Sequence, residues 1–200
     1  MQVSRRQFMA AASLLTVSVA ADAFWPFRSG PRKFSFATLS DVHLSDAKSA
    51  SIFTRALSGI SADPQVRFVV LLGGTASSGL YRELNMAKVC LQSLKKPCFV
   101  VPGEGDLEPG VPDAYANLRR VFEKYEWVER EAGWTFIGLD SCGGAEKTLR
   151  PEKMEWLRRR ARRIGRNRPV VLFSYHPLSP SAGDKRLVNA DEVLAIFKNH

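Results

Sequence analysis

Short apolar runs that alternate with helical patterns constrain this chain more than any other feature. Strand-like runs cover residues 34–39, 66–72, 98–101, 134–139 and 170–174. Helical spacing of apolar residues is found over 50–60, 80–94, 115–125, 151–164 and 188–197. Strands that alternate with helices form βαβ units. The local pattern therefore predicts an α/β fold with a mainly parallel sheet covered on both faces.

Composition agrees with a folded domain and excludes other classes. Of 200 residues, 45% are hydrophobic and 24% are charged, which excludes a disordered chain and a multi-span membrane protein. The net charge of +9 bears on solubility and on anionic partners, not on fold. The three cysteines are odd in number and form no Cys-x-x-Cys pair, so they indicate neither a disulfide framework nor a zinc site.

The first residues have the pattern of an export signal. Ser4-Arg5-Arg6 precedes an apolar segment that ends at Ala21-Asp22-Ala23, and the paired arginines resemble a twin-arginine signal. We expect a signal peptide over 1–23, a linker over 24–33 and a domain over 34–200. The twin-arginine translocase would then be a partner during export to the periplasm or the exterior. An uncleaved anchor is the alternative, but the apolar segment is shorter than the roughly 20 residues that span a bilayer. No stable membrane span is expected after cleavage.

Polar residues follow each predicted strand at its carboxyl end, where ligands bind in parallel sheets. The loops in question cover residues 40–43, 73–75, 102–106, 140–141 and 175–177. Two of the three histidines, His43 and His176, lie in these loops together with carboxylates such as Asp41 and Glu104. This grouping is typical of a metal site. Asp140-Ser141, without a Gly-x-Ser-x-Gly motif, indicates a turn rather than a nucleophilic serine.

In order, these loops resemble the motifs of the calcineurin-like metallophosphoesterase family: Asp-x-His, Gly-Asp, Gly-Asn-His-Asp/Glu, a His-x-Pro turn and Gly-His-x-His. The resemblance spans residues 34–200. It implies a two-sheet β-sandwich flanked by helices, with metals held on the strand-end loops. It also implies hydrolysis of phosphoesters by water that two divalent metals activate.

Several family positions differ in this chain. Asp41 and His43 match the first motif, but Gly74 stands where the bridging aspartate is expected. Glu104-Gly105 replaces Asn-His, and Tyr175 replaces the ligand histidine before the proline turn. The Gly-His-x-His motif is absent from residues 1–200, so we expect the C-terminal part of the domain to be missing.

These departures lead to three expectations about function. In the first, the protein is impaired or inactive as a two-metal hydrolase. In the second, it is an active phosphoesterase with at most one divalent ion (Mn, Fe or Zn), bound by Asp41, His43, Glu104 and His176. In the third, it binds a phosphorylated or anionic small molecule without turnover.

An arginine-rich segment occupies residues 158–168. Met154, Leu157, Ala161 and Ile164 keep helical spacing there, so one face is expected to be buried and the arginines to cover the rest. The segment lacks interleaved aromatics. This favours a solvated helix face over a nucleic-acid or lipid surface, and no nucleic-acid partner is expected. Cys98 and Cys142 are expected to be buried thiols, with Cys90 on the helix side opposite the apolar residues.

Overall fold

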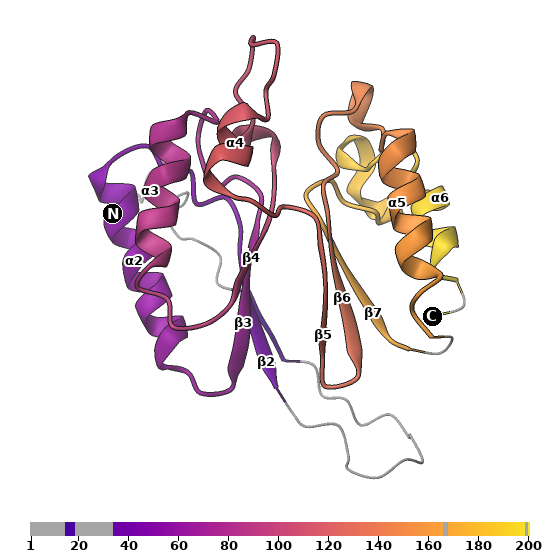
Figure 1. Cartoon of the computed structure of the whole chain (residues 1–200), viewed down its shortest axis with the longest axis horizontal. Coiled ribbons are helices and arrows are strands. Elements are labelled where there is room, and N and C mark those ends of the chain that lie inside the picture. The colour runs from indigo at the N-terminus through magenta and orange to yellow at the C-terminus, as the bar shows by residue number, and fades with distance from the viewer. Residues whose placement is uncertain (1–14, 19–33, 166–167, 199) are drawn as a thin grey trace, which may run out of the picture.

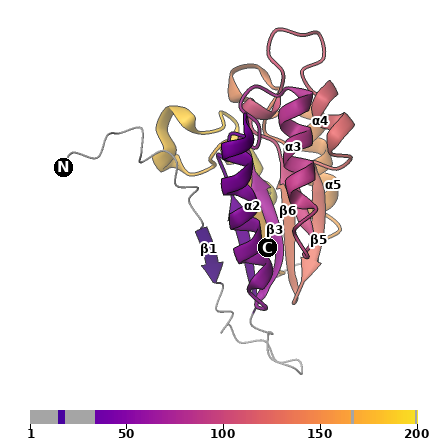
Figure 2. The ribbon, with the colours of Figure 1, turned by 90° about the vertical axis from the view of Figure 1, so that its left-hand side faces the viewer.

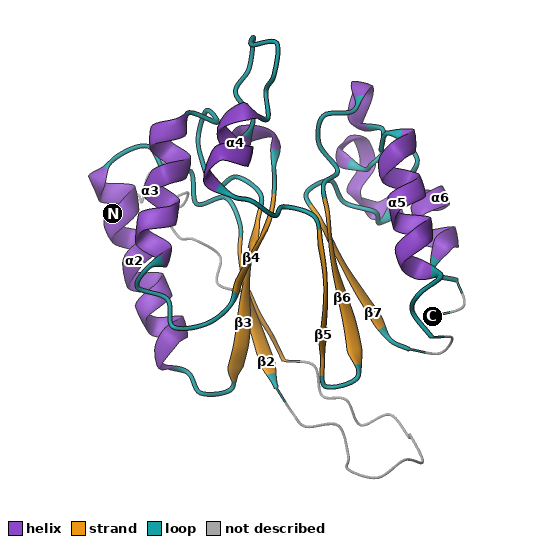
Figure 3. Ribbon diagram, in the orientation of Figure 1, coloured by secondary structure: helices purple, strands orange, loops and turns teal. Residues whose placement is uncertain are grey.

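The computed structural model describes residues 15–18, 34–165, 168–198 and 200. Two sheets pack face to face, and helices cover the outer face of each (Figure 1; Figure 3). The first half contains β2 (Ser35–Leu39), α2 (Ala47–Ala62), β3 (Val66–Leu72), α3 (Tyr81–Leu91), β4 (Cys98–Val101), a 3-10 turn (Glu104–Asp106) and α4 (Ala116–Val121). The second half contains β5 (Trp127–Glu131), β6 (Trp134–Leu139), a 3-10 turn (Ala145–Lys147), α5 (Pro151–Ala161), β7 (Val170–Ser174), a 3-10 segment (Pro180–Lys185) and α6 (Ala190–Ile196).

The strands divide into two sheets rather than one. The first has the order β1-β2-β3-β4, where β2, β3 and β4 are parallel and β1 (Leu15–Ser18) is antiparallel to β2. The second has the order β5-β6-β7, with β5 antiparallel and β7 parallel to β6. The expectation of one mainly parallel sheet, drawn from local pattern, is therefore wrong. The two-sheet sandwich flanked by helices is confirmed.

An aromatic layer between the sheets holds the sandwich together. Phe36 and Phe68 from the first sheet meet Phe136 and Phe173 from the second, and the ring of Phe136 lies 5.5 Å from Phe36 and 5.0 Å from Phe68. Edge-to-face pairs of this kind contribute beyond the burial of apolar area. Gly138 belongs to the same layer, because a side chain there would overlap the indole of Trp127.

The helices bury one face each against the sheets. Asp46 caps the N-terminus of α2: its carboxylate accepts the Ser49 backbone N–H at 2.8 Å, while Ser49 Oγ accepts from the Asp46 backbone N–H. On α3, Cys90 lies on the buried side with Leu84 and Ala87. The expectation that Cys90 faces away from the apolar side is wrong, because α2 packs there and the Cys90 thiol approaches the Ala50 carbonyl at 3.8 Å.

Most of the predicted signal peptide and linker lies outside the described residues. Leu15–Ser18 is the exception, and it pairs with Ser35–Thr38 along β2 (Figure 2). Among the described helices, none has the length and apolar character needed to cross a membrane.

The loop cluster at the carboxyl ends of the strands

The predicted loops gather at one end of the sandwich. β2, β3, β4, β6 and β7 all end on the upper side in Figure 1, where the polar strand-end loops lie together. We call this set the loop cluster, defined as residues 40–43, 73–76, 102–106, 140–142 and 175–177. Both sheets contribute to it, so the cluster spans the two halves of the sandwich.

Asp41 and His43 are held at the surface by the neighbouring loop. The Asp41 N–H donates to the Gly73 carbonyl at 3.1 Å, and the His43 N–H donates to the Gly74 carbonyl at 2.8 Å. Both residues have left-handed backbones, with φ of 54° and 47°. Their side chains are 65% and 56% exposed, and Asp41 Oδ1 lies 3.8 Å from His43 Nε2. A left-handed backbone is strained in residues other than glycine. It persists where the surrounding structure enforces it, often at functional sites.

Glu104 and His176 form the second pair of predicted site residues. His176 is buried, and its Nε2 lies 3.2 Å from Oε1 of the exposed Glu104. Its Nδ1 lies 3.0 Å from the Ser141 carbonyl, and its backbone N–H donates to Ser141 Oγ at 3.0 Å. The contact between Glu104 and His176 joins the first sheet to the second, whereas Ser141 and His176 both follow strands of the second sheet. Ser141 was not singled out as a partner from sequence, because only the fold brings the two loops together.

Asp106 is buried and ties two loops together. Its Oδ1 accepts the Ala76 N–H at 2.7 Å, and its Oδ2 accepts the Gly103 N–H at 2.9 Å. Burial raises the pKa of Asp106 from 3.8 to about 6, while these backbone hydrogen bonds act to lower it. This aspartate matches the last position of the family's third motif, and here it fastens the loop after β3 to the loop after β4.

A partly buried charged network lies beside the loop cluster. Lys153 Nζ lies 2.6 Å from Glu126 Oε2 and 3.4 Å from Asp140 Oδ2. Asp140 also accepts from the Tyr115 hydroxyl at 3.1 Å and from the Cys142 N–H at 3.0 Å. Burial raises the pKa of both carboxyls. Sequence reasoning missed this network, because Glu126 and Lys153 lie outside the predicted loops.

Of the two thiols expected to be buried, one is fully buried and the other only partly. Cys142 is buried, and its thiol approaches the Pro102 carbonyl at 3.5 Å. Cys98 is half-buried, so the prediction holds there only in part, although burial raises the pKa of its thiol to about 12. Its position at the start of the short strand β4, near the edge of the core, accounts for the difference.

The four predicted metal residues lie as two pairs, Asp41 with His43 and Glu104 with His176. Within the described ranges, no group of three His, Cys, Asp or Glu side chains is placed to hold a metal ion. Gly74 faces Asp41, since a Cβ there would lie 3.0 Å from Asp41 Oδ1, but it offers no donor atom. The ring of Tyr175, at the expected histidine position, lies against Gly73 and Gly103. The residues present do not fit a binuclear metal centre.

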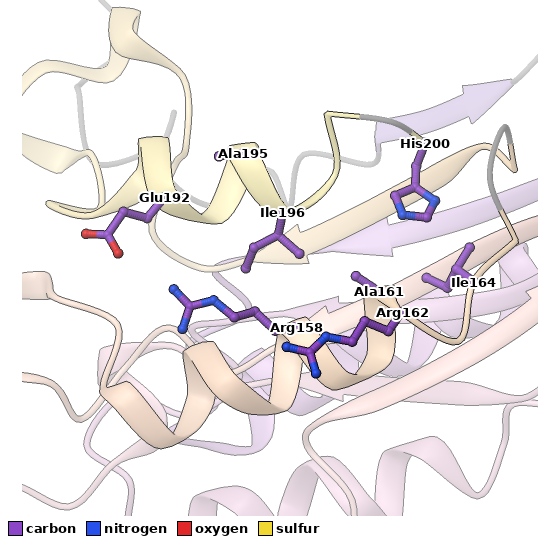
Figure 4. Close-up of a pocket in the computed structure, with 8 residues that line it drawn as sticks. All are labelled: Arg158, Ala161, Arg162, Ile164, Glu192, Ala195, Ile196 and His200. Atoms are coloured by element: carbon purple, nitrogen blue, oxygen red, sulfur yellow. The ribbon is translucent and has the colours of Figure 1, made fainter.

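A separate groove lies between α5 and α6, with a volume of about 650 Å³ (Figure 4). Its lining residues are Arg158, Ala161, Arg162, Ile164, Glu192, Ala195, Ile196 and His200, none of which belongs to the loop cluster.

The helix that borders this groove agrees with the expected solvated face. Met154, Leu157 and Ala161 are buried, while Arg158 and Arg159 lie 4.0 Å and 3.8 Å from Glu155. Arg158 and Arg159 are therefore on the exposed side of α5, and Arg158 also lines the groove.

Comparison with solved structures defines the class of fold. The chain superposes on purple acid phosphatase PPD1 from yellow lupin (Lupinus luteus) seeds with a TM-score of 0.50 and 11% identity, over 74% of this chain and 34% of that one. A phosphopantetheinyl hydrolase (PptH) from Mycobacterium tuberculosis gives a TM-score of 0.48 at 14% identity, over 78% of this chain and 73% of that one. The chain therefore shares the two-sheet fold of purple acid phosphatase PPD1.

The sequence comparison gives a particular relative. Over 125 residues the chain is 28% identical to the probable glycerophosphodiester phosphodiesterase GpdQ of Arcobacter nitrofigilis. The match covers 57% of this chain and 43% of the relative, so the chain spans less than half of that protein's length. No protein-family model matches the chain.

Proposed function

We propose that this is an exported protein of the metallophosphoesterase family that does not hydrolyse phosphoesters by the two-metal mechanism. The similarity to a glycerophosphodiester phosphodiesterase and the shared fold support the family. The observation that carries the functional part is the pairing of Gly74 with Asp41, where a bridging carboxylate would be needed.

The chemistry explains why this position decides the function. Two-metal hydrolysis uses ions about 3.5–4 Å apart that stabilise both the attacking and the leaving oxygen. A carboxylate shared by both ions holds that spacing. Gly74 contributes no oxygen, and the ring of Tyr175 lies where a second imidazole is expected. The loss of several direct ligands exceeds the 10–100-fold effect typical of a single outer-shell partner.

The second candidate is a phosphoesterase or phosphoester-binding protein that uses a single divalent ion. The exposed Asp41 and His43 side chains on strained backbones favour it, because strain of this kind is retained at ligand sites. Glu104 is exposed and supplies a hard oxygen donor. For Glu104 to bind the ion as a third ligand beside Asp41 and His43, its carboxylate would have to break its contact with His176.

Metal content and turnover test the two candidates with the full chain. We expect no hydrolysis of p-nitrophenyl phosphate or bis(p-nitrophenyl) phosphate above the rate with Mn²⁺ alone. Turnover by a chain that binds two metal ions, with both abolished by Asp41→Ala and left intact by Asp191→Ala, would overturn the first proposal. One bound Mn²⁺ or Zn²⁺ per chain, lost in Asp41→Ala, would support the single-ion candidate. Binding that Asp41→Ala leaves unchanged would refute that candidate.

The proposed export has its own test. A chain with Arg5→Lys and Arg6→Lys should remain in the cytoplasm, whereas the parent chain should reach the periplasm with its N-terminus shortened near Ala23. A parent chain that stays in the cytoplasm at full length would contradict the proposal.

A further inference from the structure

The ring of Tyr175 is seated on two glycines from two different loops. A Cβ on Gly73 would overlap the ring, and a Cβ on Gly103 would lie 2.8 Å from its Cδ2 and Cε2 atoms. Any side chain at either glycine would displace the tyrosine. The loop after β7 thereby packs on the loops after β3 and β4.

The two glycine loops also touch each other beneath the ring. A Cβ on Gly73 would lie 3.1 Å from the Gly103 Cα, and one on Gly103 would lie 2.6 Å from the Gly74 nitrogen. The Gly73 N–H donates to the Val101 carbonyl at 2.8 Å. Tyr175 therefore covers a junction where two backbones meet without side chains.

The electrostatic surroundings of Tyr175 come from two neighbouring loops. Burial raises the pKa of Tyr175, and the negative charges of Glu104 and Asp41 raise it further. The ring meets His176 edge-on, with centroids 5.2 Å apart.

We propose that Tyr175 fastens the loop cluster together in place of a metal ion, through its ring rather than its hydroxyl. A shared metal would join these loops by ligation, whereas Tyr175 joins them by packing on Gly73 and Gly103. This inference rests on the proposed function, because a chain with a working binuclear centre would have no need of such a contact.

Thermal unfolding of the full chain in EDTA is the first test. Tyr175→Ala should lower the Tm by roughly 4–8 °C, as expected for removing a packed ring from a chain of this size. Tyr175→Phe should leave the Tm within about 1 °C of the parent, because the ring is kept. A Tm for Tyr175→Phe as low as that for Tyr175→Ala would assign the effect to the hydroxyl and overturn the proposal.

A double-mutant cycle provides a test with a matched control. Gly73 and Gly110 both have left-handed backbones, with φ of +69° and +76°, but a Cβ on Gly110 would meet nothing within 4 Å. Alanine at either position costs backbone strain, and only Gly73→Ala also collides with Tyr175. In a Tyr175→Ala background, the Tm loss from Gly73→Ala should shrink toward that of Gly110→Ala but stay larger, because the added Cβ still lies 3.1 Å from the Gly103 Cα. An unchanged loss from Gly73→Ala would show that the ring is not seated there.

Added metal separates this inference from the proposed function. The Tm of the parent chain should be the same in EDTA and in excess Mn²⁺ or Zn²⁺. A Tm rise with metal that also removes the difference between Tyr175→Ala and the parent would show that the metal holds the loops. Phosphoester turnover alongside an intact double-mutant cycle would refute the proposed function and leave the role of Tyr175 standing.

Discussion

Replacing Asp106 should change the free energy of unfolding by an amount that depends on pH. Asp106→Ala leaves the buried N–H groups of Ala76 and Gly103 without an acceptor, which costs about 2–6 kcal/mol for the two. The same substitution removes a carboxyl whose burial raises its pKa from 3.8 to about 6. A pKa change of one unit corresponds to about 1.4 kcal/mol. Removing the buried carboxylate therefore stabilises the fold by about 3 kcal/mol at pH 7.

The raised pKa of Asp106 determines how its contribution to stability changes with pH. The stabilising contribution of protonated Asp106 is complete below 3.8 and is lost as the pH rises through about 6. Near pH 7 the two effects of Asp106→Ala largely oppose each other. Near pH 4.5 the stabilisation gained by removing the carboxyl falls to about 1 kcal/mol, so the cost of the two lost hydrogen bonds dominates. The cost of the substitution should therefore grow by about 2 kcal/mol on acidification.

Urea unfolding followed by tryptophan fluorescence at the two pH values measures this cost, provided that the slope against urea stays constant. Asp191 is the control of opposite sign, because its ion pair with Arg186 lowers its pKa and stabilises the fold above that value. The cost of Asp191→Ala should stay nearly constant between pH 7 and pH 4.5, because both values lie above its ordinary pKa of 3.8, and it should shrink only at lower pH. A cost for Asp106→Ala that is independent of pH, or that grows toward pH 7, would refute the account of this carboxyl.

Three further substitutions test the packing of the sandwich by the same urea assay. Phe136→Ala, in the aromatic layer, should cost about 3–5 kcal/mol, and a loss below 1 kcal/mol would contradict the packing described. Gly79→Ala should cost more than Gly133→Ala, since both have positive φ but only the Gly79 Cβ overlaps neighbouring backbone; equal costs would refute this. Lys153→Met should cost about 3–5 kcal/mol by leaving Glu126 unpaired, and less at pH 5 than at pH 8, because protonation relieves the buried carboxyl. A loss independent of pH would refute the account of this network.

Sequence reasoning located the buried strands well because they are short, apolar and closed by turn residues. Val66–Leu72, Cys98–Val101, Trp134–Leu139 and Val170–Ser174 have the predicted bounds. Trp127–Glu131 was missed, since three of its five residues are charged and its pairing with β6 is not visible in local pattern. Most helix ends were overextended, as in α3, which ends at Leu91, whereas α2 extends beyond its predicted bounds to Ala47–Ala62.

The candidate site was predicted as a set of loops but not as an arrangement. Parallel strands bring their carboxyl ends together, so the gathering of the loops followed from the pattern. The division into Asp41 with His43 and Glu104 with His176 depends on side-chain packing between sheets, which no spacing reveals. The seat of Tyr175 likewise depends on two glycines far apart in the sequence.

The hydrogen bond between His176 and Glu104 crosses from one sheet to the other. Any sliding of the two sheets past each other must therefore change the distance between these two side chains. Substitutions deep in the aromatic layer, far from every loop, should alter the loop cluster as well as the stability. Hydrogen exchange at the Ser141 and His176 amides would register such a shift before the protein unfolds as a whole.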